Sequence, residues 1–167
     1  MTMKKLIYRR ILVAMDGSEC SELALRHAVQ FARTHRAKLH LLYVVDEIGL
    51  NVGQPRTPDE FWQAVRKAGK GTLDKAKAQA AESGIATQTK LIEIPTMGSL
   101  VRHVAEVIVQ EAVRSRADLV VVGTHGRRGL SRLLLGSVAE GVLRHCTVPV
   151  LLVRGRATRR KPRSREA

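Results

Sequence analysis

The residues best suited to chemistry lie between Gly123 and Ser137, directly after an apolar run at residues 119–122. They follow the spacing Gly123-x2-Gly126-x9-Gly136-Ser137. Glycines after a buried strand let main-chain N–H groups approach an anion, because no Cβ stands in the way. A helix that opens at Gly136-Ser137 adds free N–H groups and the positive end of its dipole. The segment predicts a cradle for the phosphate of a nucleotide or another phosphate ester.

This spacing differs from the two commonest nucleotide fingerprints. No G-x-G-x-x-G follows the first predicted strand, so a dinucleotide has little support. Gly136 and Gly141 are spaced as in a P-loop, but Val142 and Leu143 stand where that loop needs Lys and Ser or Thr. Glycines alone are also compatible with a tight strand-to-helix connection, so the surrounding elements must decide.

Apolar periodicity predicts five strands that alternate with four helices. The expected strands are Ile11–Met15, Leu39–Val45, Ile85–Ile94, Leu119–Val122 and Val150–Val153. The expected helices run from a Ser18 cap to His35, from Thr57-Pro58 to Ser83-Gly84, from a Ser99 cap through Ala112, and from Ser137 to about His145. Gly69 and Gly71 should weaken the middle of the second helix. The order predicts an α/β fold: a single-domain, Rossmann-like open sheet, mainly parallel and five-stranded, with helices on both faces.

Three segments are expected to meet at one crevice. Ligands of open α/β sheets bind outside the carboxyl ends of the strands, where the winding direction reverses. Asp16, residues 44–46 and Gly123 all follow or end predicted strands. This convergence favours a nucleotide site over a bare turn, although Asp16 could also serve only as an Asx-turn former before Ser18.

The composition is that of a globular chain with an aliphatic core. Of 167 residues, 44% are hydrophobic but only 3% are aromatic, which suits a parallel sheet covered by helices. Cys20 and Cys146 are too few and too far apart for a disulfide framework or a C-x-x-C motif, so a reducing, cytoplasmic location is expected. No apolar run approaches the ~18 residues that a membrane span needs, and no hydrophobic leader precedes Asp16.

The formal net charge of +14 is unevenly distributed. Residues 154–167 carry seven basic side chains against Glu166, and they lack apolar periodicity. We therefore expect a folded domain over residues 1–153 and a disordered basic tail over residues 154–167. Such a tail could bind nucleic acid or anionic lipid weakly through phosphate contacts, or it could be solvated without a specific partner.

Several of these segments resemble the universal stress protein family. They are Ile-Leu-Val-Ala-Met-Asp-Gly-Ser from residue 11, Leu-Leu-Tyr-Val-Val-Asp from residue 41, the glycine-rich stretch from residue 117 to residue 130, and Leu-Leu-Leu-Gly-Ser-Val-Ala-Glu from residue 133. The resemblance extends from Arg9 to Arg154. Family members with G-x2-G-x9-G-(S/T) form an ATP-binding branch, and each fixed position of that motif is filled here. Leu100 departs from the family, because many members have Pro there.

The resemblance implies ATP as the ligand, with ADP or AMP as alternatives and Mg²⁺ or Mn²⁺ accompanying the nucleotide. Ala14, Met15 and Asp16 would flank the adenosine, with Asp16 near the ribose or a metal, and Val44 would contact the adenine. The remaining residues form two implied groups: a loop around the ribose and phosphates (Val122, Gly123, Gly126 and Arg127) and donors to the phosphates (Gly136, Ser137 and Val138).

The leading hypothesis is a cytoplasmic stress-response protein that binds ATP as a regulatory or signalling ligand. A slow ATP-hydrolysing or phosphotransfer enzyme is the first alternative, since Arg127, Arg128 and Arg132 offer charge although no general base is evident. A nucleic-acid-associated protein that uses the tail is the second. His125 is expected to be a loop residue and no catalytic residue is assigned; the other histidines show no metal-ligand pattern. A homodimer through the edge strand Val150–Val153 is expected, because an apolar edge strand needs cover and because the resemblance implies such a dimer; a monomer whose edge the tail shields is the alternative.

Overall fold

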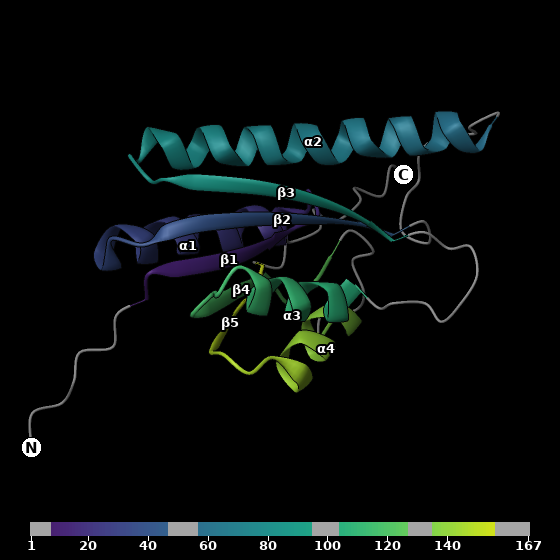
Figure 1. The fold of residues 1–167 in the computed structure, drawn as a ribbon. Coiled ribbons are helices and arrows are strands. Elements are labelled where there is room, and N and C mark those ends of the chain that lie inside the picture. The colour runs from purple at the N-terminus through teal and green to yellow at the C-terminus, as the bar shows by residue number, and fades with distance from the viewer. Residues whose placement is uncertain (1–7, 47–56, 95–103, 127–134, 156–167) are drawn as a thin grey trace, which may run out of the picture.

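Five parallel strands form one sheet in the order β3-β2-β1-β4-β5 (Figure 1). The computed structural model describes residues 8–46, 57–94, 104–126 and 135–155. The strands are β1 (Arg10–Met15), β2 (Lys38–Asp46), β3 (Thr87–Ile94), β4 (Leu119–Gly123) and β5 (Val150–Val153). The four helices are α1 (Glu19–His35), α2 (Pro58–Glu82), α3 (Val104–Arg114) and α4 (Ser137–His145). The predicted fold class is therefore confirmed.

The helix starts that local sequence signals predicted are confirmed for α1 and α2. The Ser18 hydroxyl oxygen accepts a hydrogen bond from the Ser21 N–H at 3.1 Å, and the Thr57 hydroxyl oxygen accepts one from the Glu60 N–H at 3.2 Å. The third strand starts later than predicted, because the Ile85 N–H is still bonded to the Ala80 carbonyl at the end of α2. Ser99, the expected cap of the third helix, lies outside the described residues.

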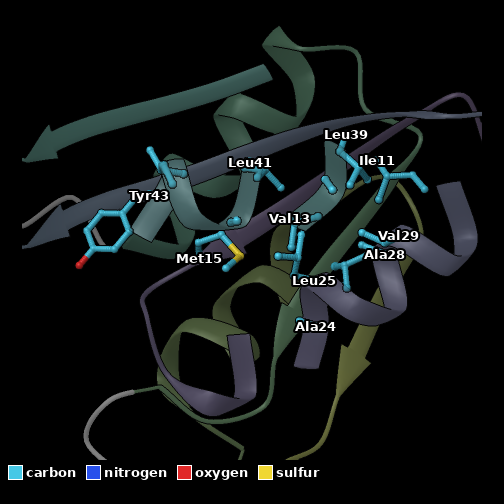
Figure 2. Close-up of a cluster of buried hydrophobic side chains, with 14 of the residues drawn as sticks. Ile11, Val13, Met15, Ala24, Leu25, Ala28, Val29, Leu39, Leu41 and Tyr43 are labelled. Atoms are coloured by element: carbon cyan, nitrogen blue, oxygen red, sulfur yellow. The ribbon is translucent and has the colours of Figure 1, made fainter. Parts of the chain in front are cut away.

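Helices cover both faces of the sheet. On one face, α1 and α2 pack on β1 and β2 around Val13, Leu25, Leu41 and Tyr43 (Figure 2). On the other face, α3 and α4 enclose a second cluster that includes Leu12, Ile108 and Val142. Both clusters are almost purely aliphatic, as the composition predicted. Within the described ranges, no helix has the length and apolar character needed to cross a membrane.

Gly69 has a packing role that the sequence did not indicate. The helix α2 continues through Gly69 and Gly71 without a break. A Cβ at Gly69 would lie 2.8 Å from Leu91 Cδ1 and 2.9 Å from Tyr43 Cδ1, whereas a Cβ at Gly71 would meet nothing within 4 Å. Gly69 therefore lets α2 lie close to β2 and β3, whereas Gly71 has no such packing role.

The strand order sets the position of the expected crevice. The chain adds β2 and β3 on one side of β1 and then crosses to add β4 and β5 on the other. The winding direction consequently reverses between β1 and β4, and an open α/β sheet binds its ligand at the carboxyl ends of such a strand pair.

Candidate nucleotide-binding site

Asp16 follows β1 in a turn that fixes its side chain. One carboxylate oxygen, Oδ1, accepts a hydrogen bond from the Ser18 N–H at 2.9 Å. Gly17 completes the turn with a φ of +79°, which side chains rarely adopt. The Asx turn foreseen as the simpler role of Asp16 is therefore present. It holds the carboxylate at the reversal of the sheet.

The loop after β4 comes very close to this carboxylate. A Cβ at Gly126 would lie 2.8 Å from Asp16 Oδ2, so any side chain at Gly126 would have to displace the carboxylate. Residues 110 positions apart in sequence thus meet at the junction of β1 and β4, as the convergence argument predicted. The contact brings the loop after β4 against the side chain that follows β1.

Gly136 closes the other side of the same loop. Its N–H donates to the Thr124 carbonyl at 2.9 Å, and a Cβ at Gly136 would lie only 3.1 Å from that oxygen. The φ of Gly136 is −63°, and Gly126 is not among the glycines with positive φ. Close approach, rather than a left-handed conformation, is therefore why these positions need glycine. Sequence reasoning did not single out Thr124, whose carbonyl anchors the loop.

The N-terminus of α4 opens directly from this loop. Gly136 is its N-cap and carries no side chain that could bond the first-turn N–H groups. Ser137 and Val138 follow, and both are exposed. A helix that starts in this way presents N–H donors and the positive end of its dipole. Such a helix N-terminus is suited to binding an anion.

An apolar wall lies on the α3 and α4 face of the sheet, along β1, β2 and β4. Ala14 and Val44 are half-buried there, and Val122 is buried. Ile92, which sequence reasoning missed, pairs with Val44 in register and belongs to the same face. The alternation of the long strand β3 would have identified it.

Met15 differs from the other residues of the expected site. It is only 4% exposed and packs into the cluster on the α1 and α2 face, as Figure 2 shows. Successive side chains of a strand point to opposite faces, so Ala14 and Met15 cannot both line the apolar wall. The side chain of Met15 therefore lies away from the apolar wall.

The packing of Cys20 against Gly123 leaves no room for a side chain at that position. A Cβ there would lie 2.9 Å from Cys20 Sγ and 3.1 Å from the Cys20 carbonyl carbon. The Cys20 thiol donates to the Val153 carbonyl at 3.1 Å, which joins the start of α1 to the ends of β4 and β5. The absence of a side chain at Gly123 thus serves the seat of α1.

His125 lies inside the loop. Its Nδ1 is 2.9 Å from the Thr124 hydroxyl, and its buried Nε2 has no hydrogen-bond partner among the residues that the structure describes. Arg127, which the resemblance places at the phosphates, lies outside the described residues, as do Arg128 and Arg132. The described ranges contain no group of three or more His, Cys, Asp or Glu side chains suited to a metal ion.

An ion pair fixes the carboxyl end of β3. Arg66 of α2 donates from Nε and from a terminal nitrogen to Glu93, at 2.6 and 2.9 Å. The hydrogen bond from Arg66 holds the pKa of Glu93 below its ordinary value, against the opposing effect of partial burial. This pair attaches α2 to the edge strand of the sheet.

Known proteins share this sequence and fold. The chain matches the universal stress protein family over residues 7–154. It is 36% identical over 153 residues to universal stress protein MJ0531 of Methanocaldococcus jannaschii, covering 89% of this chain and 83% of that protein. It is also 33% identical over 156 residues to universal stress protein YxiE of Bacillus subtilis, covering 89% of this chain and all of that protein.

Solved structures agree with the sequence relatives. Protein MJ0577 of M. jannaschii superposes with a TM-score of 0.73 at 27% identity, covering 92% of this chain and 100% of that one. A universal stress protein of Archaeoglobus fulgidus in complex with dAMP gives a TM-score of 0.62 at 26% identity over 89% of this chain and 99% of that one. A further universal stress protein structure, in complex with cAMP, gives a TM-score of 0.63 at 25% identity over 89% of this chain and 98% of that one. With these matches in sequence and in structure, the chain belongs to the universal stress protein family.

Proposed function

We propose that this protein binds ATP at the junction of β1 and β4 and acts in a stress response through its nucleotide-bound state. The observation that carries the proposal is that the Asp16 carboxylate, the glycine loop after β4 and the uncapped N-terminus of α4 come together at the junction of β1 and β4. The N–H groups at the start of α4 suit a phosphate, and the Asp16 carboxylate suits a ribose hydroxyl. Two structural neighbours bound to dAMP and cAMP support an adenine nucleotide.

Each group at the proposed site has a physical role. The apolar wall of Ala14, Val44 and Val122 would hold the adenine. Asp16 would accept from a ribose hydroxyl or hold an accompanying Mg²⁺ or Mn²⁺. The N–H groups at the start of α4, with the Ser137 hydroxyl and the Val138 N–H, would bind phosphate oxygens. The main chain of Met15, Gly123 and Gly126, together with Arg127, would complete the enclosure.

We propose ATP as a regulatory ligand, with ADP or AMP as the alternatives and slow ATP hydrolysis or phosphotransfer as the alternative activity. Phosphoryl transfer needs a positioned nucleophile and stabilisation of charge at the phosphate. The carboxylate of Asp16 already accepts from the Ser18 N–H and adjoins Gly126, which suits positioning of a ligand. Turnover assays with and without Mg²⁺ distinguish a regulatory ligand from a substrate.

The first experiment identifies the ligand. Mass spectrometry of the small molecule released from denatured, purified protein should detect an adenine nucleotide. Calorimetric titration of ligand-free protein with ATP, ADP, AMP and cAMP should then rank these nucleotides. Protein that releases no nucleotide and binds none of the four in titration would refute the proposal.

The second experiment tests the two glycines of the loop. Gly126→Val and Gly136→Val should lower ATP affinity at least tenfold while circular dichroism shows a retained fold, because the new side chain would displace the Asp16 carboxylate or the Thr124 carbonyl from its place at the proposed site. Ser137→Ala should cost about 1–3 kcal/mol if its hydroxyl pairs with a phosphate. Gly71→Val is the matched control, since open space surrounds that glycine. Wild-type affinity in a folded Gly126→Val or Gly136→Val protein would contradict the site.

We further propose a homodimer that pairs through β5. This strand is at one end of the sheet, and Leu143 of the neighbouring helix α4 is 52% exposed. Such an edge and apolar surface are normally covered. Sedimentation at micromolar concentration should show a dimer, and a monomer alone would exclude it.

We also propose the extent of the folded domain, the role of the tail and the location of the protein in the cell. We assign residues 1–153 to the nucleotide-binding domain, residues 154–167 to a disordered basic tail with weak polyanion affinity, and the protein to the cytoplasm. Deletion of residues 156–167 should leave folding and ATP affinity nearly unchanged and should reduce only salt-dependent polyanion binding. A large loss of ATP affinity at fixed ionic strength would place the tail in the site.

A further inference from the structure

A cluster of basic side chains lies at the end of the sheet opposite the proposed nucleotide site. We call it the amino-edge patch, and its six exposed members are Arg9, Arg10, Arg33, Arg36, Lys38 and Arg116. Arg10 and Lys38 are paired in register at the first residues of β1 and β2, and the Arg10 Nε donates to the Arg116 carbonyl at 2.6 Å. In Figure 1 these strands start at the left, so the patch lies on that side.

The positive charge of this patch exceeds the negative charge beside it, since six cations face one nearby carboxylate. None of its six side chains forms an ion pair with any residue in the described ranges. Asp118 is the nearby acid, but its two oxygens accept from the backbone N–H groups of Arg9 and Arg10 at 2.9 and 3.0 Å. Elsewhere the pattern differs: Arg66, Lys75, Lys90 and Arg144 each pair with a glutamate.

Two of the arginines occupy backbone positions that favour glycine. Arg36 follows α1 with a φ of 53°, and Arg116 follows α3 with a φ of 52°. The equivalent turn after α2 uses Gly84, with a φ of 70°. Glycine is the usual residue at such helix ends because it carries no Cβ. Attraction to the negative end of the helix dipole explains a basic residue in the last turn, but it does not require arginine in a left-handed conformation.

Aromatic rings adjoin the patch. Tyr8 precedes Arg9, and its ring centroid lies 5.2 Å from that of His35 and 6.5 Å from that of Phe31. Phe31 and His35 are stacked at 6.0 Å with an interplanar angle of 13°. All three rings are partly exposed. The surface therefore combines cations with π faces within the first residues of β1 and the last turns of α1.

We propose that the amino-edge patch binds single-stranded nucleic acid. Phosphates would bind the exposed arginines and Lys38, while unpaired bases would stack on the rings of Tyr8, Phe31 and His35. A duplex hides its base faces and an anionic membrane offers none, so the aromatic group favours a single strand over both. The patch shares no residue with the basic tail of residues 154–167, which has no aromatic side chain.

The patch and the proposed nucleotide site lie at opposite ends of the strands. The six residues of β1 span about 17 Å between Arg10 and Met15. An oligonucleotide on the patch should therefore bind together with ATP. Saturating ATP should leave oligonucleotide affinity unchanged, which separates this surface from the β1 and β4 junction and makes the inference independent of the proposed function.

The test uses full-length protein with fluorescein-labelled twelve-nucleotide oligouridylate and oligothymidylate in anisotropy titrations. The variant Arg33→Gln/Arg36→Gly/Lys38→Gln should bind both at least tenfold more weakly. Because three phosphate contacts are lost, the plot of log affinity against log salt should become shallower, with its negative slope reduced in magnitude by about 2. The matched control is Lys67→Gln/Lys70→Gln/Lys77→Gln, which removes the same charge from exposed positions of α2 and should bind nearly as wild type.

Two further variants keep the result interpretable. Arg36→Gly/Arg116→Gly relieves two left-handed arginines, so its melting temperature should be equal to or above that of wild type while its oligonucleotide affinity falls. Tyr8→Leu should weaken single-strand binding by about 5- to 100-fold and should leave duplex binding unchanged. Binding that falls only when the melting temperature falls would overturn the proposal.

Other outcomes also overturn it. An equal loss in the α2 control would show that net charge alone attracts the probe. If oligonucleotide affinity falls only in Arg159→Gln/Arg160→Gln/Lys161→Gln, while the patch variant binds as tightly as wild type, binding belongs to the tail. A duplex of the same length that binds as tightly as the single strand would exclude base stacking. Patch-dependent capture on phosphatidylserine vesicles without oligonucleotide binding would identify a membrane surface instead.

Discussion

Glu111 offers the sharpest test of what holds α3 on the sheet. The side chain is only 4% exposed, although it lies on a helix that covers β2. Its Oε1 lies 3.1 Å from His40 Nε2 on β2, and its Oε2 accepts from Lys90 Nζ on β3 at 2.7 Å. One carboxylate therefore joins a helix to two strands. Replacement by alanine removes the shared acceptor and leaves both His40 and Lys90 without this partner.

The size of the effect follows from burial. Breaking a fully buried ion pair by removing one partner costs about 3–5 kcal/mol. Here the remaining partners are partly accessible, with side-chain exposures of 15% for His40 and 35% for Lys90, so water can recover part of the loss. We expect Glu111→Ala to lower the free energy of unfolding by about 3 kcal/mol, near the lower end of that range. For a chain of this size, that corresponds to a fall in melting temperature of about 6–12 °C.

Urea denaturation followed by circular dichroism measures this free energy, and thermal melts check it. Glu140→Ala is the control, because it breaks the exposed pair with Arg144 and should cost about 0.3–0.5 kcal/mol. Glu111→Gln should fall between the two, since it keeps the shape and an acceptor but loses the charge. If Glu111→Ala is no more destabilising than Glu140→Ala, the carboxylate does not hold α3 and the reasoning is refuted.

Two further predictions concern α2. Gly69→Ala should destabilise by about 1–3 kcal/mol, because its Cβ would overlap Leu91 and Tyr43, whereas Gly71→Ala should stabilise by about 0.5–1 kcal/mol; equal effects in urea titrations would contradict the packing argument. Glu93→Gln should lower the melting temperature at pH 7 but not in acid. Since the pKa of Glu93 is depressed in the folded state, its stabilisation is present above the ordinary pKa of about 4.3 and is lost as pH falls through the lower folded value. A difference between Glu93→Gln and wild type that is the same at pH 7 and pH 3 would contradict the linkage.

Local signals in the sequence predicted the elements well. Thr57-Pro58 and Ser18 marked helix starts because caps act within a few residues. Alternating strands and helices restrict the topology strongly, so a parallel sheet with helices on both faces could be expected from the sequence. The meeting of Asp16 with the segment that begins at Gly123 was expected because both follow the carboxyl ends of strands.

Contacts between distant segments could not be predicted in the same way. Gly69 was interpreted as a weak point of a helix, but its role depends on two side chains from β2 and β3. Gly123 was assigned to the anion cradle, and its structural constraint comes from Cys20. The opposite orientations of Ala14 and Met15 follow from strand alternation and could have been foreseen. Contact of these residues with a nucleotide stays a prediction.

The central position of β1 has a consequence for the order in which the molecule folds. The pairing of β1 with β2 closes a short loop. Its pairing with β4 closes a much longer one, because the joined residues are 108 positions apart, as for Arg10 and Asp118. Closing a long loop costs more entropy, so the β1–β4 ladder should form late, after the β1–β2–β3 unit. On the ribosome, the first three strands are complete while β1 still has one open edge. Until β4 is synthesised, that edge presents unpaired N–H and C=O groups to which a strand of another chain could pair.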